Sequence, residues 1–260
     1  MADQTRSPRD FYDSVWRTWG HLDASSPAAF HRRRLVAARA AERRTAPARI
    51  LDVGCGQGEL LAELGRAFPA ARLAGADVSL ESLEQTRRTV ENAELFELDL
   101  GDPAALASRP EQLGRYDLVV CSEVLEHLGD DALAARHLAA LLAPAGRLVA
   151  TVPGGKLSRF DELIGHQRHY RPPGLRSLFE CAGLTVETID AWGFPFHSFY
   201  RSLVRVASRW SLGARGSGPA RAGRGLGVLY AWSGALLRPL FYLNLSRWGE
   251  QLVCVARAPG

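Results

Sequence analysis

Short apolar runs alternate with amphipathic segments along most of the chain. Seven apolar runs predict strands, at 48–55, 72–79, 93–100, 116–125, 147–153, 184–192 and 250–258. Apolar residues at helical spacing predict helices between the strands, at 58–68, 80–90, 130–143 and 172–183. Strands that alternate with helices are typical of a mostly parallel sheet with helices on both faces. The pattern therefore predicts an α/β fold with a doubly wound seven-stranded sheet, which binds ligands beyond the carboxyl ends of its strands.

Two regions lie outside this alternating pattern. The N-terminal region predicts an aromatic helix at 11–20 and then a basic helix at 31–44, which Pro47 ends. The second region separates the last two strands and predicts a helical insertion. We therefore expect three parts, which are a helical lid segment at 1–45, a core at 46–192 and 249–260, and a helical cap at 193–248.

The composition is that of an ordinary folded protein. Hydrophobic residues make up 47% and charged residues 23% of the 260 positions. The four cysteines form no CxxC pair, which favours buried free thiols in a reducing compartment over a disulfide or metal framework. The first residues are polar and lack the apolar core of a secretory signal, so the expected location is the cytoplasm. No set of metal ligands is predicted.

A glycine-rich turn follows the first strand and reads Gly54-Cys55-Gly56-Gln57-Gly58. A P-loop would need Gly-Lys-Ser/Thr after its glycines, whereas Glu59 and Leu60 follow here, so a nucleoside triphosphate is disfavoured. The dinucleotide fingerprint GxGxxG would place a glycine where Glu59 stands, and a carboxylate there would repel a pyrophosphate. A nicotinamide dinucleotide is therefore only the second choice of ligand.

Three aspartates lie at or near the ends of the first three strands, namely Asp52, Asp77 and Asp99. An acid beside the glycine turn can support the binding of a cationic amino-acid group. Asp77 can accept hydrogen bonds from both hydroxyls of a ribose, and Asp99 can accept one from an adenine amino group. An ammonium, a ribose and an adenine together point to S-adenosylmethionine rather than to a phosphate ligand.

Five motifs occur in order: LDVGCGQGEL (51–60), GADVS (75–79), ELDLGD (97–102), YDLVVCSEVLEHL (116–128) and LLAPAGRLVATVP (141–153). Together they resemble the motifs of class I S-adenosylmethionine-dependent methyltransferases, in the group that includes ubiquinone-type O-methyltransferases and many natural-product enzymes. The resemblance covers residues 45–192 and the last strand. It implies a Rossmann-like methyltransferase fold whose seventh strand runs antiparallel, and S-adenosylmethionine as the cofactor.

The resemblance also implies roles for residues at the strand ends. Those expected to contact the cofactor are Asp52 in support of the turn, Gly54, Cys55, Gly56 and Gly58 along the methionine and ribose, Asp77 at the ribose, Val78, Asp99 and Leu100 around the adenine, and Ser122 and Glu123 near the methyl group.

Three histidines are candidates for a catalytic base, because a hydroxyl acceptor needs one while carbon or amine acceptors can do without. His127 belongs to an EHL motif common in the family, where it either helps to shape the site or is a satisfied core histidine. The related quinone O-methyltransferases have Gly-Thr-His where this chain has GHQRHY, with His166 and His169. His166 is the first choice as base or substrate contact and His169 the second, since either can titrate near neutrality. The alternative is that these loop histidines only cap or pack.

Aromatic residues complete the expected pocket. Tyr170 can add a hydroxyl beside the histidines. The family often closes its site with an N-terminal aromatic helix, so Tyr12, Trp16 and Trp19 are expected to cover the cofactor. The alternative is that these three residues only pack within the helix.

The insertion has an unusual charge distribution. Between Asp190 and Glu250 there are eight arginines and no acidic residue. The arginines at 201, 205 and 209 are spaced by four and would share one helical face. A glycine-rich stretch at 214–225 predicts a mobile loop, and 227–245 is apolar, although its proline, asparagine, glycines and arginine argue against a transmembrane span.

Two interpretations of the insertion stay open. It is either a cap that buries aromatic residues such as Phe196 and Tyr200 over a substrate pocket, or a basic amphipathic element that contacts a membrane through 194–246. Both favour a hydrophobic acceptor. The apolar content argues against a nucleic-acid partner, and the oligomeric state is not predicted.

The sequence thus predicts an S-adenosylmethionine-dependent methyltransferase that acts on a hydrophobic or amphipathic small molecule, with O-methylation in secondary metabolism favoured. C- or N-methylation of a natural-product or lipid acceptor is the alternative, because no residue separates these reactions. Two other classes stay open, a nicotinamide-dependent oxidoreductase and a non-catalytic cofactor-binding scaffold at a membrane surface.

Overall fold

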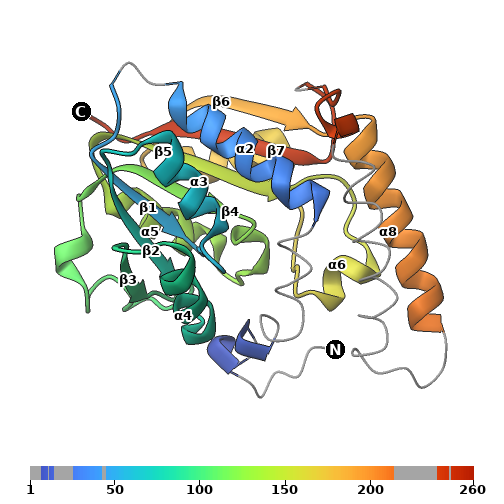
Figure 1. Cartoon of the computed structure of the whole chain (residues 1–260), viewed down its shortest axis with the longest axis horizontal. Coiled ribbons are helices and arrows are strands. Elements are labelled where there is room, and N and C mark those ends of the chain that lie inside the picture. Colours follow the sequence, from blue (N-terminus) through green and yellow to red (C-terminus); the bar gives the residue numbers. More distant parts are fainter. Residues whose placement is uncertain (1–6, 11, 15–25, 43–44, 214–238, 246) are drawn as a thin grey trace.

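The chain folds around one seven-stranded sheet (Figure 1). The computed structural model describes residues 7–10, 12–14, 26–42, 45–213, 239–245 and 247–260. The strands are β1 (Arg49–Val53), β2 (Arg72–Asp77), β3 (Glu94–Glu97), β4 (Tyr116–Ser122), β5 (Leu142–Pro153), β6 (Thr185–Trp192) and β7 (Gln251–Arg257).

The order of the strands across the sheet is β3-β2-β1-β4-β5-β7-β6. Neighbouring strands pair in parallel from β3 to β5. Only β7 runs antiparallel to its two neighbours, β5 and β6. The predicted α/β fold with an antiparallel seventh strand is confirmed. The winding reverses between β1 and β4, which places a ligand site at the carboxyl ends of these two strands.

Helices cover both faces of the sheet (Figure 1). On one face, α2 (Pro27–Ala41) and α3 (Glu59–Ala67) pack on the sheet, and α4 (Leu80–Thr89) lies beside α3. On the other face, α5 (Asp131–Leu141) and α7 (Pro172–Cys181) cover the sheet.

Strand β4 shows why the sheet is buried on both sides. Leu118 and Val120 join the core under α2 and α3, whereas Val119 and Cys121 join the core under α5 and α7. Successive side chains of a strand point to opposite faces, so an unbroken apolar run supplies both cores. Each fully buried aliphatic side chain stabilises the fold by about 1.5–3 kcal/mol.

Helix α2 belongs to the core layer, and its Arg32 Nη1 lies 3.7 Å from Glu123 Oε2 at the end of β4. Its residues Val36, Ala37 and Ala40 are buried against Ile50 of β1 and Leu64 of α3. Ahead of α2, the residues of the expected lid segment at 1–45 that the structure describes as helical are 8–10 and 12–14. The expectation that residues 1–45 form a lid stays a prediction.

The boundary between α5 and β5 differs from the prediction. The helix was expected to run to Ala143 and to be stopped by the Pro-Ala-Gly stretch that follows, yet it ends at Leu141 and β5 begins at the next residue. Leu142 pairs with Tyr116, after which the register shifts and Ala145 takes a positive φ of 58°. Strand pairing with β4 therefore prevails over helical periodicity in the last two residues.

The insertion begins as predicted with a helix, α8 (Phe196–Gly213). Asn244 caps its first turn, because the side-chain Oδ1 accepts hydrogen bonds from the backbone N–H groups of Phe196 and His197 at 2.8 and 3.2 Å. Tyr200 packs with Trp192 and Phe241 in a small third core. The predicted loop at 214–225 and most of the apolar stretch at 227–245 lie outside the described residues. Within the described part of the chain, no helix is long and apolar enough to cross a bilayer.

Candidate active site

The glycine turn lies where β1 meets α3 and is held against β2. The backbone N–H groups of Gly54 and Cys55 donate to the carbonyl of Ala76 at 2.7 and 3.1 Å. Gly54 has a φ of +75°, and a Cβ there would lie 2.3 Å from Val124 Cγ2. Only glycine fits this position, because a side chain would be strained and would collide with the end of β4. The bare backbone allows a ligand to approach closely.

Asp77 ends β2 directly beside the turn and is buried. Its Oδ2 accepts from the N–H of Gly56 at 3.0 Å, and its Oδ1 accepts from the N–H of Ser79 at 2.9 Å. Burial raises the pKa of Asp77, although these hydrogen bonds oppose the rise. Each carboxyl oxygen keeps a second lone pair, so Asp77 can accept two further hydrogen bonds from neighbouring hydroxyls.

Asp52 of β1 is a buried acid beside the glycine turn. The residue is 1% exposed, and among the described residues neither of its carboxyl oxygens has a hydrogen-bond partner. Burial and the charge of Asp77 raise the pKa of Asp52 to about 8. A buried carboxyl without a partner is costly, and a cationic group of a ligand would relieve that cost. Asp52 therefore fits the ammonium of an amino-acid moiety.

The affinity for S-adenosylhomocysteine is expected to rise between about pH 6 and pH 8. Asp52 must lose a proton to pair with the ligand's ammonium, and its pKa is about 8. Below this pKa, each pH unit changes the binding constant by up to about tenfold. Calorimetric titration in buffers of different ionisation enthalpy measures both the affinity and the released proton. Asp52→Asn should remove both effects, and a pH-independent affinity of the unaltered protein would contradict the assignment.

The residues expected around the adenine line the neighbouring strand ends. Asp99 follows β3, and its Oδ1 accepts from the N–H of Gly101 at 2.8 Å. Leu100 is buried and Val78 is half-buried. Cys55 is buried under the turn, with its Sγ 3.7 Å from the hydroxyl of Thr86, and burial raises its pKa. The Cys55 thiol therefore packs beneath the site.

Tyr12 lies over these strand ends. Burial raises the pKa of its phenol, and the charges of Glu126, Asp77 and Asp99 raise it further. The Tyr12 ring lies edge-on to His127, with 5.7 Å between the ring centroids. The next residue, Asp13, accepts a hydrogen bond from Ser79 Oγ. Residues 12–13 therefore bridge the adenine side and the β4 side of the site, whereas Trp16 and Trp19 lie outside the described residues.

Ser122 and Glu123 at the end of β4 belong to a hydrogen-bonded chain. Thr151 donates to Glu123 Oε1 at 3.0 Å, and Ser122 Oγ lies 2.8 Å from the Thr151 hydroxyl. Gln251 donates to the same Glu123 oxygen at 2.7 Å. Burial alone would raise the pKa of Glu123, but the charge of Arg32 and these hydrogen bonds hold it below its usual range. Glu123 is therefore a fixed, ionised carboxylate.

The three candidate histidines come together although two separate loops supply them. His127 lies in η2 (Leu125–His127) after β4, and its ring centroid is 4.7 Å from that of His166. His166 and His169 follow β5 and α6 (Arg159–Leu163), and His166 Nδ1 lies 3.2 Å from His169 Nε2. Burial and the charge of His127 lower the pKa of His166 to about 4. His166 is therefore neutral at neutral pH and can accept a proton.

Sequence reasoning missed two buried acids in this cluster. Glu126 is fully buried, its Oε1 lies 4.0 Å from His166 Nε2, and burial raises its pKa well above the usual range. Asp161 lies 3.7 Å from His169 Nε2. The EHL motif could have drawn attention to Glu126. The Ser158-x-x-Asp161 pattern is that of a helix capping box and marks Asp161 as a capping residue, but it does not indicate the contact with His169.

The cluster is close enough for a metal ion but is assigned none. The ligand atoms of Glu126, His127 and His166, and those of Asp161, His166 and His169, each lie within 4.8 Å of one another. However, Asp161 already accepts from Ser158, and the two histidines of its set contact each other. The expectation that the protein needs no metal stays a prediction.

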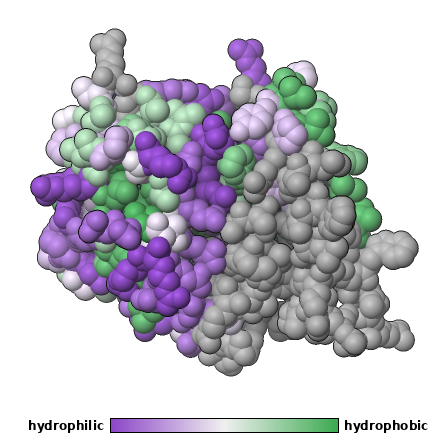
Figure 2. Space-filling view, in the orientation of Figure 1, coloured by the Kyte–Doolittle hydropathy of each residue, from purple (hydrophilic) through white to green (hydrophobic). Residues whose placement is uncertain are grey.

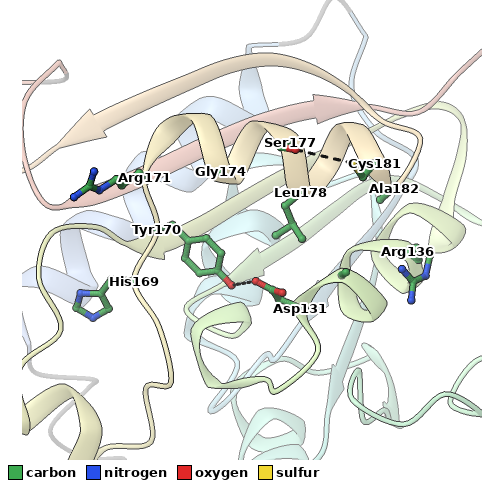
Figure 3. Close-up of a pocket in the computed structure, with 11 residues that line it drawn as sticks. Asp131, Arg136, His169, Tyr170, Arg171, Gly174, Ser177, Leu178, Cys181 and Ala182 are labelled. Carbon is green, nitrogen blue, oxygen red and sulfur yellow. Dashed lines mark hydrogen bonds between the residues drawn. The ribbon is translucent and has the colours of Figure 1, made fainter.

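The remaining predicted substrate contacts lie in packed surroundings. The Tyr170 hydroxyl lies 2.8 Å from Asp131 Oδ2, which ties the histidine loop to the start of α5 (Figure 3). Tyr170 and His169 also line a cavity of about 490 Å³ between α5 and α7. Phe196 is half-buried at the start of α8, and Tyr200 is buried in the third core. Their roles as substrate contacts stay predictions.

Comparisons with known proteins agree with this arrangement. The Methyltransferase domain family matches residues 28–189. The ubiquinone biosynthesis O-methyltransferase of Xanthomonas axonopodis pv. citri is 32% identical over 188 residues, which cover 63% of this chain and 72% of that protein. The Marinobacter nauticus enzyme of the same name is 35% identical over 119 residues, 45% of this chain and 49% of that protein. The chain thus spans about half the length of the Marinobacter nauticus enzyme. A third relative is an uncharacterized protein of a Streptomyces fradiae transposon, which is 40% identical over 104 residues, 40% of this chain and 29% of that protein.

Solved structures share the whole fold. The [4+2]-cyclase SpnF superposes with a TM-score of 0.65 at 19% identity, over 96% of this chain and 94% of that one. Haemonchus contortus phosphoethanolamine N-methyltransferase 2, in complex with S-adenosyl-L-methionine, gives a TM-score of 0.64 at 17% identity, over 100% of this chain and 62% of that one. At these identities the likeness speaks only for the fold. The family match over most of the chain, on a sheet with this strand order, shows that the chain belongs to the class I S-adenosylmethionine-dependent methyltransferases.

Proposed function

We propose that the protein transfers a methyl group from S-adenosylmethionine to a hydroxyl of a hydrophobic or amphipathic small molecule. One observation carries this proposal. His166 is neutral at neutral pH. It lies in the histidine cluster beyond β4 and β5, in contact with His127 at the carboxyl end of β4, the strand that pairs with β1. Carbon and amine acceptors can react without a base, whereas a hydroxyl acceptor benefits from one.

The residues of the site fit the parts of the cofactor. The unpartnered carboxyl of Asp52 suits its ammonium, the two open lone pairs of Asp77 suit the ribose hydroxyls, and Asp99 suits the adenine amino group. When bound, S-adenosylmethionine supplies an electrophilic methyl group for displacement by the acceptor oxygen. The glycine turn and Asp77 orient the ligand, because in-line transfer depends mainly on alignment.

The remaining residues of the site act on the acceptor. Tyr12 shields the strand ends from water. His166 takes the proton of the acceptor hydroxyl at Nε2, since its Nδ1 is engaged with His169. Glu123, held as a carboxylate, raises the proton affinity of His166 by its negative charge.

The insertion supports an apolar acceptor and contact with a membrane. Most exposed large hydrophobic side chains among the described residues lie in this part of the chain, namely Phe194, Phe199, Leu203, Val206, Tyr242, Leu243, Leu245 and Trp248. Figure 2 shows hydrophobic residues along the edge that α8 forms. Arg201 and Arg205 of α8 pair with Asp161 and Glu250, whereas Arg247, next to Trp248, is exposed and can complement an anionic lipid surface. We therefore propose that the insertion contacts a membrane through 194–246 and that the acceptor is drawn from this membrane.

Co-sedimentation with vesicles that contain phosphatidylglycerol tests this contact. Leu243→Asp places a charge on the exposed surface and is expected to lower the bound fraction strongly, because a buried leucine contributes about 1.5–3 kcal/mol to partitioning. Leu113→Asp, at an exposed leucine elsewhere on the protein, is the matched control and should leave binding unchanged. Equal binding of both variants, or no binding of the unaltered protein, would contradict the proposal.

Acceptor profiling tests the reaction itself. The protein is incubated with S-adenosylmethionine labelled in the methyl group and with matched series of apolar phenols, amines and enolisable ketones. Label is expected in the phenol series, and Asp77→Ala should abolish its incorporation. Label in the amine or ketone series alone would replace O-methylation by N- or C-methylation. Cofactor binding without incorporation into any series would favour a non-catalytic scaffold.

A further inference from the structure

Asp161 is a buried acid that the reaction described so far does not use. It lies in α6 and is 5% exposed. The N–H and hydroxyl of Ser158 donate to its Oδ2 at 2.8 and 2.7 Å, and Arg201 Nη2 lies 3.3 Å from its Oδ1. Burial alone would raise the pKa of Asp161, but these partners hold it below its usual range. Asp161 is therefore a fixed negative charge inside the protein.

His169 stands between this charge and His166. Its Nε2 lies 3.7 Å from Asp161 Oδ2 and 3.2 Å from His166 Nδ1. Its Nδ1 has no hydrogen-bond partner among the described residues, so Nε2 is the atom that joins the chain of contacts. The side chain of His169 is 2% exposed, which leaves little water to stabilise a charge on it.

The hydrogen-bond chemistry of the two rings determines the direction of proton flow. If Nε2 of neutral His166 is to accept a proton, the ring must carry its own proton at Nδ1. That Nδ1–H then donates to Nε2 of His169. A second proton on His166 would leave a cation beside His127, whose charge lowers the pKa of His166. A proton on His169 would instead lie against Asp161.

We propose that His166, His169 and Asp161 form a proton relay that carries the acceptor's proton away from the methyl-transfer site. The acceptor O–H bond breaks as an N–H bond forms at His166 Nε2. The proton at His166 Nδ1 moves to His169 Nε2, so that His166 ends neutral and His169 ends as a cation paired with Asp161. The relay rests on the proposed function, since only a hydroxyl acceptor supplies this proton.

The charged groups around the two rings include some that favour the cation on His169 and two arginines that oppose it. His166 faces Glu126 and His127 from η2, and it senses Glu123, Asp161 and His169. His169 senses Asp161 and Glu123, opposed by Arg201 and Arg205. Burial lowers the pKa of both histidines, and the opposing charge of His127 is felt at His166. The position near Asp161 is therefore the better place for the cation.

The relay also connects the insertion to the reaction. Arg201 comes from α8, 40 residues after Asp161, and its Nη1 donates to the carbonyl of Glu250 at 3.3 Å. Arg205, one turn further along α8, lies 3.0 Å from the Glu250 carboxylate. The first turns of α8 thereby fix Asp161 relative to β7. Arg201 and Asp161 are positioning residues in this scheme, because each acts through His169.

A titration by NMR tests the relay without any acceptor. The ring protons of His169, assigned by their loss in His169→Gln, are followed against pH in the complex with S-adenosylhomocysteine. In Asp161→Asn, the midpoint of His169 is expected to fall by about one pH unit or more, because the negative charge that favours its cation is gone. Asp161→Glu keeps a carboxylate and should restore much of the shift. Asp190→Asn, which removes the partner of Arg39 at 2.7 Å elsewhere in the protein, is the matched control and should change nothing.

Kinetics on a hydroxyl acceptor give the second readout. In Asp161→Asn, kcat is expected to fall at least about tenfold, with unchanged KM and cofactor affinity. In this variant, the acidic limb of the pH–rate profile, which reports the protonation of the base, is expected at a lower pH than in the unaltered protein. The reason is that the His169 cation is less stable without the Asp161 carboxylate. If Asp161 had only a structural role, Asp161→Asn would instead lower the cofactor affinity or raise KM, and the acidic limb of the pH–rate profile would stay at the same pH.

The outcomes separate the relay from the function on which it rests. An unchanged His169 midpoint or an unchanged limb overturns the relay, even if hydroxyl acceptors are methylated. A shifted midpoint without methylation of any hydroxyl acceptor refutes the proposed function. In that case Asp161 still pairs with His169, but the relay has no proton to carry.

Discussion

Asp77→Ala is expected to weaken the binding of S-adenosylhomocysteine by about 10²-fold or more. In the proposed binding mode, the substitution removes two charge-assisted hydrogen bonds to the ribose, each of which contributes about 1.5–3 kcal/mol. It also leaves the N–H groups of Gly56 and Ser79 without their acceptor, which loosens the glycine turn. Isothermal titration calorimetry measures the effect directly.

Glu84→Ala is the matched control for this loss. Glu84 is an acid on the exposed face of α4, where it pairs with Arg87 and Arg88. Exposed pairs of this kind contribute little to stability, so the variant should bind the nucleoside normally. Normal binding in Asp77→Ala as well would show that the carboxylate does not hold the ribose, and it would require a different orientation of the cofactor.

His166→Ala is expected to lower turnover on a hydroxyl acceptor by about 10²-fold or more while the cofactor affinity stays the same. The pKa of His166, lowered to about 4, keeps the ring neutral and able to accept a proton at neutral pH. Activity carried by this base should therefore be present at neutral pH and fall as the pH drops through the pKa of the ring. Initial rates with saturating S-adenosylmethionine, measured against pH, test both statements.

His137→Ala provides the comparison for His166→Ala. His137 is a buried histidine of α5 whose Nδ1 contacts the carbonyl of Leu100 at 3.2 Å, so it probes the adenine side of the site and not the acceptor side. This variant is expected to affect binding or stability more than turnover. Full turnover in His166→Ala would exclude that histidine as the base and would shift attention to His127.

The secondary structure and the positions of the glycine turn and of the acids at the strand ends could largely be predicted from the sequence, because they depend on neighbouring residues. Periods of two and of about 3.6 in the apolar pattern indicate strands and helices. The glycine turn and the acids that follow β2 and β3 lie at strand ends, and parallel strands bring their carboxyl ends to the same edge of the sheet. Asp52, Asp77 and Asp99 therefore come together for a reason that is visible in the sequence.

The histidine cluster was only half predictable. His166 and His169 were candidates because of their residue type and loop, but their contact with His127 depends on how the loop after β5 folds onto the end of β4. Arg201 was noted only as one of the arginines on one face of the predicted insertion helix, and nothing in the sequence connected Asp161 or Arg201 with the histidines. Each is an ordinary surface residue type, and their pairing across 40 positions exists only once α8 packs against α6.

The sequence by itself thus determined the sheet, its connecting helices, the glycine turn and the row of acids beside it. Only the tertiary structure placed α2 in the core, brought Tyr12 over the strand ends and joined Asp161, His169 and His166 in one chain. The physical reason is that periodicity and spacing act within a few residues. By contrast, partners from distant segments decide whether a buried charge is tolerated. Gln251, for example, donates a hydrogen bond to Glu123 across 128 positions of the chain.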